Sequence, residues 1–122
     1  MKKKEQSTKK SQLAESIYDY IDSKKGTNLI LLDLVQVNPY FQHIIIATAS
    51  SSLHLKSIAR SILKDFARDL PAGGHGVKPT DYESGWVVID FIDVVVHLFL
   101  SEQRNYYNLE RLWGDAPRLR ES

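Results

Sequence analysis

Apolar residues dominate one continuous stretch, residues 85–100, and the rest of the chain is organised around it. The stretch is rich in β-branched and aromatic residues, which favour strands, and it is too long for one ordinary strand. Ile92 and Asp93 lie in its middle, so the pattern predicts two antiparallel strands joined by a tight turn. Two-residue turns favour Asn-Gly or Asp-Gly, and Ile92 suits a positive φ poorly, so a longer or bulged loop is the alternative.

Pairing Phe91 with Val94 divides this hairpin into two faces, because side chains alternate along a strand. One face is entirely apolar and is expected to belong to the core: Val87, Ile89, Phe91, Val94, Val96 and Leu98. The other face mixes large apolar groups with two polar ones: Trp86, Val88, Asp90, Val95, His97 and Phe99. Such a face either lies under a helix, with Trp86 as a core residue, or binds a partner.

Before the hairpin, the pattern predicts two helices and two strands. A stripe of Leu13, Ile17 and Ile21 indicates a helix capped by Ser11. Strands are expected at 29–35 and 43–48. A serine of the run 50–52 is expected to cap a second helix that Pro71 ends; its apolar positions are Leu55, Ile58, Ala59, Ile62, Leu63 and Phe66.

Around and after the hairpin, a short strand is expected at Val77, stopped by Pro79, and a last helix from a Ser101 cap to Gly114. Its apolar side is formed by Tyr106, Leu109, Leu112 and Trp113. The order helix, strand, strand, helix, short strand, hairpin, helix predicts an α/β fold: a single-domain sandwich with a mixed β-sheet and about three helices.

The composition bounds the class of protein. With 122 residues and no cysteine, the chain is expected to form one domain without disulfides or a catalytic thiolate. No apolar run reaches the ~18 residues of a membrane span, and none follows the N-terminal lysines as in a signal peptide. We therefore expect a soluble, cytoplasmic protein without membrane contact.

The charge is unevenly placed along the chain. Residues 1–10 hold five lysines and one glutamate, so the remainder has 11 basic and 14 acidic residues, a net charge of about −3 although the whole chain is +1. We expect residues 1–10 to be a disordered basic tail that touches phosphate at most non-specifically, 11–116 the folded domain, and 117–122 a loose tail. An acidic body suits a basic protein partner better than nucleic acid. The helical stripe Lys56, Arg60, Lys64 and Arg68 is interpreted as a solvated face rather than a phosphate contact.

Candidate chemistry is sparse. The four histidines (His43, His54, His75 and His97) lack metal-ligand spacing, and the serines 50–52 lack a nucleophile elbow. No phosphate-binding glycine motif is present. Three carboxylates lie in or beside apolar strands: Asp33, Asp90 and Asp93. We interpret them as hydrogen-bonded carboxylates at strand ends, which is simpler than a site that binds two metal ions. No catalytic residue, metal or cofactor is assigned, which favours a binding module.

The chain resembles the ribosomal silencing factor (RsfS, or Iojap) family from about Ser11 to Ala116. The matching runs are Ala47-Thr48-Ala49-Ser50-Ser51-Ser52-Leu53-His54, Gly85-Trp86-Val87-Val88-Ile89-Asp90, Asp93-Val94-Val95-Val96-His97 and Glu102-x-Arg104-x-x-Tyr107-x-Leu109-Glu110-x-Leu112-Trp113. The chain departs from the family pattern at Gln42, Ala49, Ile92 and the run Gly76-Val77-Lys78-Pro79. These departures concern loops.

The resemblance implies a function and a fold. Family members bind the large ribosomal subunit through large-subunit ribosomal protein fourteen and block joining of the small subunit, which silences translation. Organelle relatives act in large-subunit biogenesis. The family fold is similar to nucleotidyltransferases, without their catalytic residues.

The leading hypothesis is therefore a non-enzymatic translation repressor whose partner-binding residues are Trp86, Val88, Asp90, Val95, His97, Phe99, Tyr107 and Glu110. One alternative is a nucleotidyltransferase-like enzyme that binds nucleotide and metal at Ser50–Ser52 and Asp90. Another is a homodimer formed through the sheet face that carries Trp86, with the ribosome bound elsewhere. A minor contact of the lysine tail with ribosomal RNA is also compatible with the sequence.

Overall fold

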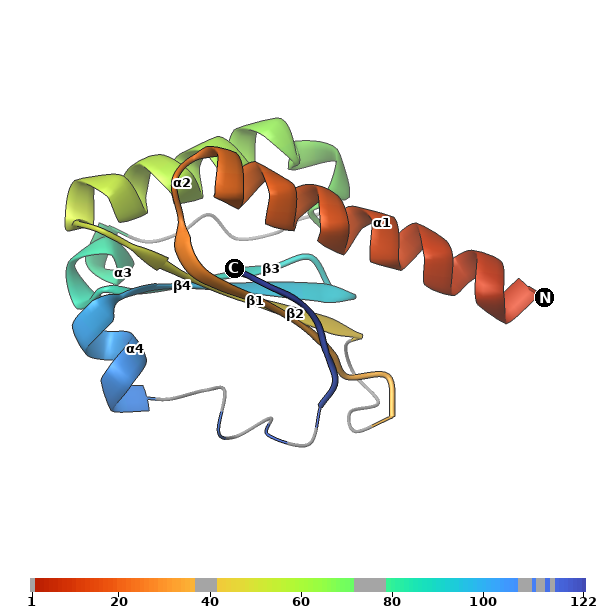
Figure 1. The fold of residues 1–122 in the computed structure, drawn as a ribbon. Coiled ribbons are helices and arrows are strands. Elements are labelled where there is room, and N and C mark those ends of the chain that lie inside the picture. The colour runs from red at the N-terminus through yellow and green to blue at the C-terminus, as the bar shows by residue number, and fades with distance from the viewer. Residues whose placement is uncertain (1, 37–41, 72–78, 108–110, 112–113, 115) are drawn as a thin grey trace.

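The computed structural model describes residues 2–36, 42–71, 79–107, 111, 114 and 116–122, without the side chains of 2–11, 79–81, 106 and 107. Its elements, in chain order, are α1 (Lys2–Ser23), β1 (Thr27–Asp33), β2 (His43–Ala49), α2 (Ser52–Asp65), the 3-10 helix η1 (Ala67–Asp69), α3 (Pro79–Ser84), β3 (Trp86–Asp90), β4 (Val94–Leu100), α4 (Ser101–Tyr107) and β5 (Arg118–Glu121) (Figure 1).

The strands form one mixed sheet in the order β3-β4-β2-β1-β5. β2 pairs with β4 in parallel, and the other neighbouring pairs are antiparallel. This confirms the α/β class, the mixed sheet and the strands expected at 29–35 and 43–48. It adds the helix α3 and the strand β5, which the hydrophobic pattern did not predict.

The hairpin has the predicted register. Trp86 pairs with Phe99 and Asp90 with Val95, and the Phe91 amide donates to the Val94 carbonyl at 2.8 Å. Phe91, Ile92 and Asp93 connect the two strands, and the Asp93 amide also donates to the Phe91 carbonyl at 3.0 Å. Ile92 adopts a φ of 76°. Its amide donates to Asp90 Oδ1 at 2.7 Å, which helps to hold a conformation that a β-branched residue disfavours.

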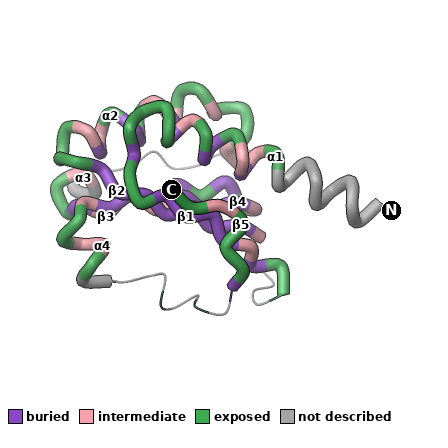
Figure 2. The backbone as a smooth tube through the Cα atoms, in the orientation of Figure 1, coloured by how far each residue is buried: buried purple, intermediate pink, exposed green. Residues whose placement is uncertain are grey.

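Two helices cover one face of the sheet. α1 and α2 lie side by side over the strands (Figure 1), and beneath them lie the six side chains expected in the core, each at most 4% exposed. The other face carries a second apolar cluster: Ile30, Leu32, Leu34, Ile44, Ile46, Val95, Phe99 and Ala116. α4 lies on this side, at one end of the sheet (Figure 1). The strands are therefore buried on both faces over much of their length (Figure 2).

Several element ends differ from the predictions. α1 begins at Lys2, so Ser11 lies inside it, and residues 2–10 are helical where a disordered tail was expected. Neither Gly nor Pro interrupts residues 2–23, so a helix anchored by buried Ile17 and Ile21 propagates backwards through good helix formers.

The predicted ends of α2 and α4 agree with the structure in part. The expected cap of α2 is confirmed, because Ser51 Oγ accepts from the His54 amide at 3.1 Å. α2 ends at Asp65 and gives way to η1 before Pro71, and Ser101 is the first residue of α4 rather than its cap. The strand expected at Val77 lies outside the described residues. The same holds for the apolar side of the last helix, whose expected residues lie outside the described residues or side chains: Tyr106, Leu109, Leu112 and Trp113.

The C-terminal segment is part of the sheet, so the prediction of a loose tail at 117–122 is wrong. β5 pairs with β1, and Leu29 and Ser122 exchange backbone hydrogen bonds of 3.0 and 2.9 Å. Arg120 donates to Asp19 at 2.7 Å and lies 4.2 Å above the centre of the Tyr18 ring. These contacts come from α1, more than a hundred residues earlier, so no local pattern indicated them. Of the described helices, none has the length and apolar character to cross a membrane.

Gly85 allows a test of the junction between α3 and β3. It has a φ of +80°, and an added Cβ would lie 2.7 Å from Gln103 of α4. Gly85→Ala should lower the free energy of unfolding by about 1–2 kcal/mol, because a side chain in the left-handed region is strained. Urea unfolding measures this. The loss should persist in the Gln103→Ala background, where the contact is absent; its disappearance there would show that crowding rather than φ causes it.

Candidate functional site

Three aromatic rings meet on the sheet face opposite α1 and α2, which we call the Trp86 face (Trp86, Val88, Asp90, Val95, His97 and Phe99). The Trp86 and Phe99 rings stack with centroids 5.1 Å apart, and His97 lies 6.0 Å from Trp86. Trp86 Nε1 donates to His97 Nδ1 at 3.1 Å. The indole is therefore fixed both by stacking and by a hydrogen bond, which reduces the entropy that it would lose on binding.

The hydrogen bond fixes the protonation of His97. Nδ1 accepts a hydrogen bond from the indole N–H, so the neutral imidazole carries its own proton on Nε2. Burial lowers the pKa of His97 from 6.5 to about 4, because the charged imidazolium would lose hydration. Near neutral pH, His97 is thus an uncharged acceptor that orients Trp86.

The structure divides the six predicted residues of this face into an accessible and a supporting group. Val88 is 46% exposed, Asp90 is exposed, and Trp86 and His97 are half-buried. Phe99 is fully buried and Val95 is 8% exposed, so in this conformation both pack beneath the surface instead of reaching a partner. Sequence alternation placed all six on one face, but it did not show this difference in depth.

The other two predicted contacts cannot be placed. Tyr107 ends α4, but its side chain lies outside the description, and Glu110 falls outside the described residues.

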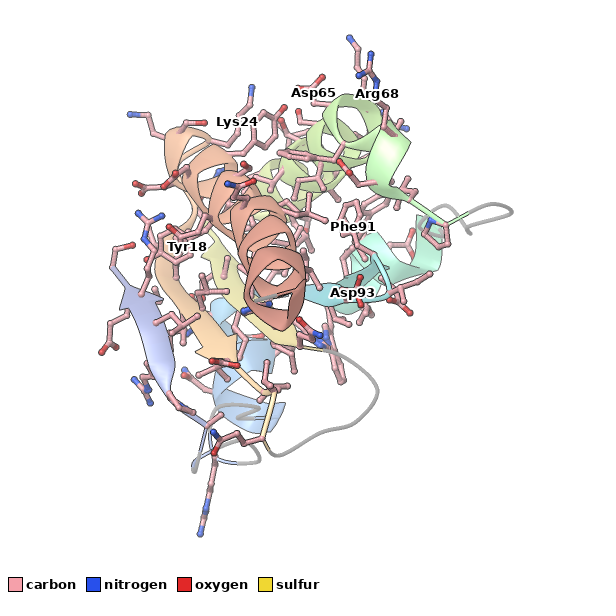
Figure 3. The ribbon with its side chains drawn as sticks, turned by 90° about the vertical axis from the view of Figure 1, so that its right-hand side faces the viewer. Tyr18, Lys24, Asp65, Arg68, Phe91 and Asp93 are labelled. Carbon is pink, nitrogen blue, oxygen red and sulfur yellow. The ribbon has the colours of Figure 1, made fainter. Side chains whose placement is uncertain are left out.

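Two of the three carboxylates considered for catalysis accept hydrogen bonds from backbone amides at strand ends. Asp33 Oδ1 accepts from the Val35 amide at 3.0 Å, and Asp90 Oδ1 accepts from the Ile92 amide. Both are thus hydrogen-bonded at strand ends, as the simpler interpretation predicted. Asp93 lies at the hairpin turn, with its side chain shown in Figure 3. Within the described ranges, no group of three or more His, Asp or Glu side chains is arranged to hold a metal ion.

The serines at 50 and 51 make local hydrogen bonds at the start of α2. Ser51 caps α2, and His54 Nδ1 accepts from the Ser50 amide at 2.9 Å. His54 Nε2 lies 2.7 Å from the Lys24 carbonyl, to which it donates in this tautomer. His54 therefore ties the end of α1 to the start of α2. This role accounts for the histidine without catalysis or metal binding.

Known proteins are similar to this chain over most of its length. The model of the family described as "Ribosomal silencing factor during starvation" matches residues 6–122. The chain belongs to the ribosomal silencing factor family. The ribosomal silencing factor RsfS of Bacillus subtilis is 39% identical over 98 residues, covering 79% of this chain and 80% of the relative.

Two further relatives extend this family assignment. A solved structure from Bacillus halodurans has a TM-score of 0.68 at 31% identity and covers 90% of this chain and 98% of its own. The chloroplastic protein Iojap of Zea mays is 32% identical over 93 residues, covering 75% of this chain and 39% of that protein. The RsfS and Iojap resemblance is confirmed.

Arg104 lies in the family motif at 102–113, but the sequence did not indicate its structural role. Its guanidinium donates to the Asn28 carbonyl and, at 2.8 Å, to Thr48 Oγ1. It thereby ties α4 to the start of β1 and the end of β2. Arg104 and Asn28 border a pocket of about 480 Å³, which is also lined by Leu29, Ile30, Asn105, Glu121 and Ser122. The motif alone signalled this residue, because its partners are remote in sequence.

The lowered pKa of His97 should make the free energy of unfolding depend on pH. The unfolded chain binds the proton near pH 6.5 and the folded chain near 4, so the unfolded state holds more protons between these values. The free energy of unfolding should fall by up to roughly 3 kcal/mol as the pH drops through this window. Urea unfolding at several pH values measures the slope.

The matched variant is His97→Gln, which keeps a polar side chain but does not titrate. Its stability should change less with pH than that of the wild type. His43 is also buried with a lowered pKa and remains in both proteins, so the difference between their slopes isolates His97. Equal slopes would contradict the assigned pKa.

Proposed function

We propose that this chain binds the large ribosomal subunit through large-subunit ribosomal protein fourteen, using the accessible part of the Trp86 face, and thereby represses translation. The bound chain would occupy space that the small subunit needs, so repression requires exclusion but no catalysis. The observation that carries the proposal is the fixed, partly exposed Trp86 beside exposed Val88, in a chain of this family.

The surface has the composition of a protein contact. A large aromatic residue held in one orientation is typical of the few residues that dominate binding energy. Val88, at 46% exposed, adds apolar area on the same face of β3. Phe99 supports the indole from below, so contact would not require the core to rearrange.

Charge favours a basic partner. Asp90 is exposed at the end of β3, and residues 11–122 carry a net charge of about −3. A negative net charge and a carboxylate on the binding face speed encounter with a positively charged surface and select against acidic ones. This electrostatic argument supports a ribosomal protein as the direct contact of the Trp86 face.

The first experiment is co-sedimentation with purified large subunits, with subunit joining followed in parallel. Wild type should pellet and block joining. Trp86→Ala should lose binding by roughly 30-fold or more, as for a residue worth about 2 kcal/mol or more at an interface. A wild type that does not pellet at low salt would refute the proposed function, and nucleotide binding would then be tested.

A matched pair of variants tests which surface is used. Val88→Asp and Leu53→Asp each place a carboxylate at an exposed apolar position, and Leu53, at 79% exposed, lies at the start of α2 on the other side of the sheet. Calorimetry with purified ribosomal protein fourteen should show weakened binding only for Val88→Asp. Equal affinities would assign the contact elsewhere.

Light scattering on the same proteins addresses the homodimer alternative. If wild type is a dimer and Trp86→Asp a monomer that still binds the large subunit, the Trp86 face is a dimer contact and the proposed binding face is wrong.

A further inference from the structure

Four basic residues form a stripe along α2 and η1, half-buried at Lys56 and exposed at Arg60, Lys64 and Arg68. The opposite side of α2 buries Leu55, Ile58, Ala59 and Ile62 against the sheet, so this helix cannot turn the stripe inwards. Figure 3 shows Arg68 on the outer side of the helix layer, directed away from the strands. The stripe therefore faces outwards on the layer opposite the Trp86 face.

Within the part of the chain that the structure describes, no carboxylate forms an ion pair with these four side chains. The ion pairs found there belong to Arg118 and Arg120. Asp65, the acidic residue of α2, accepts a hydrogen bond from Tyr20 of α1 instead. Lys56 lies 5.8 Å from the centre of the Tyr82 ring, a cation–π contact that involves no carboxylate.

The arrangement works against helix stability. Like charges four residues apart repel each other on a helix surface. Lys64 gains some compensation because it lies in the last turn, where cations meet the negative end of the helix dipole. Arg60, in the middle of α2, gains none. A bound anion would remove this repulsion.

We propose that this stripe binds the phosphate backbone of RNA. Basic residues four apart recur about every 6 Å along a helix, so they present a row of charges to a regularly charged chain. A membrane surface is disfavoured, because the apolar face of α2 is already buried in the core and cannot insert among lipids. The name of the family places its members at the ribosome, where RNA is the abundant polyanion.

This inference goes beyond the proposed function and does not depend on it. The Trp86 face and the stripe lie on opposite sides of the sheet (Figure 1), so a protein bound to the first leaves the second accessible. It also revises the interpretation of the stripe as a merely solvated face.

The test measures binding of the full chain to an RNA duplex of roughly 20 base pairs by fluorescence anisotropy, between roughly 50 and 200 mM salt. The variant is Arg60→Gln/Lys64→Gln. The control is Arg111→Gln/Arg118→Gln, which removes two exposed positive charges outside the α2 stripe. Loss of two phosphate contacts should lower the slope of log affinity against log salt by about 1.8 and weaken binding at least about tenfold at the low-salt end. The control should stay near wild type.

Thermal unfolding accompanies the titration, and the α2 variant should be at least as stable as wild type because repulsion is relieved. If it is less stable, Arg60→Gln and Lys64→Gln are measured singly, each with a slope change of about 0.9. Unchanged binding of the α2 variant, or equal weakening of variant and control, would overturn the proposal. Displacement of the RNA by polyglutamate at equal charge concentration would assign the stripe to an acidic protein instead.

Discussion

The parallel pairing of β2 with β4 is the constraint on which the rest of the structure depends. All seven residues of β2 are buried, and each pairs with a residue of β4 from His43–Val94 to Ala49–Leu100. A strand buried on both faces and both edges must satisfy its backbone groups within the sheet, because water cannot reach them. The pairing brings the hairpin, which lies about fifty residues later in the sequence, alongside β2, with β3 at the edge of the sheet. It thereby fixes which hairpin face meets α1 and α2.

The two layers that result have different properties. The face under α1 and α2 is closed by apolar side chains of both helices, and its contribution is stability. On the other face, apolar packing continues through Phe99 and Val95 but ends in side chains that remain partly exposed, Trp86 and Val88. An aromatic surface supported by a rigid sheet is well suited to bind another protein, since little order is lost when it does so.

The chain belongs to a family of regulatory factors, and its surface carries an aromatic group held in one orientation. The comparisons identify a ribosomal silencing factor family member, and the geometry directs attention to the indole that His97 holds in place. The α2 stripe adds an outward basic surface to a domain of negative net charge. A domain with an aromatic contact on one side and a basic stripe on the other is suited to a setting where protein and RNA lie close together.

The sequence by itself determined the hairpin, its register and its two faces. It did so because alternation in a strand is local, and a turn at Ile92 and Asp93 leaves one pairing that keeps six apolar residues together. It also predicted that a serine of the run 50–52 caps α2, and the structure identifies that serine as Ser51. The sequence contains no recognisable catalytic motif. The family assignment rested equally on local runs, which homologous chains share.

Only the tertiary structure decided how deep each residue lies and which remote segments meet. Phe99 and Val88 are equivalent in the alternation, yet one is fully buried and the other half exposed, because burial depends on what packs over a strand. β5 and its contacts with Tyr18 and Asp19 were not visible in the sequence, because four residues carry no clear pattern and their partners lie at the other end of the chain. The same reason applies to Arg104: a motif marks the residue, but only folding brings Asn28 and Thr48 within its reach.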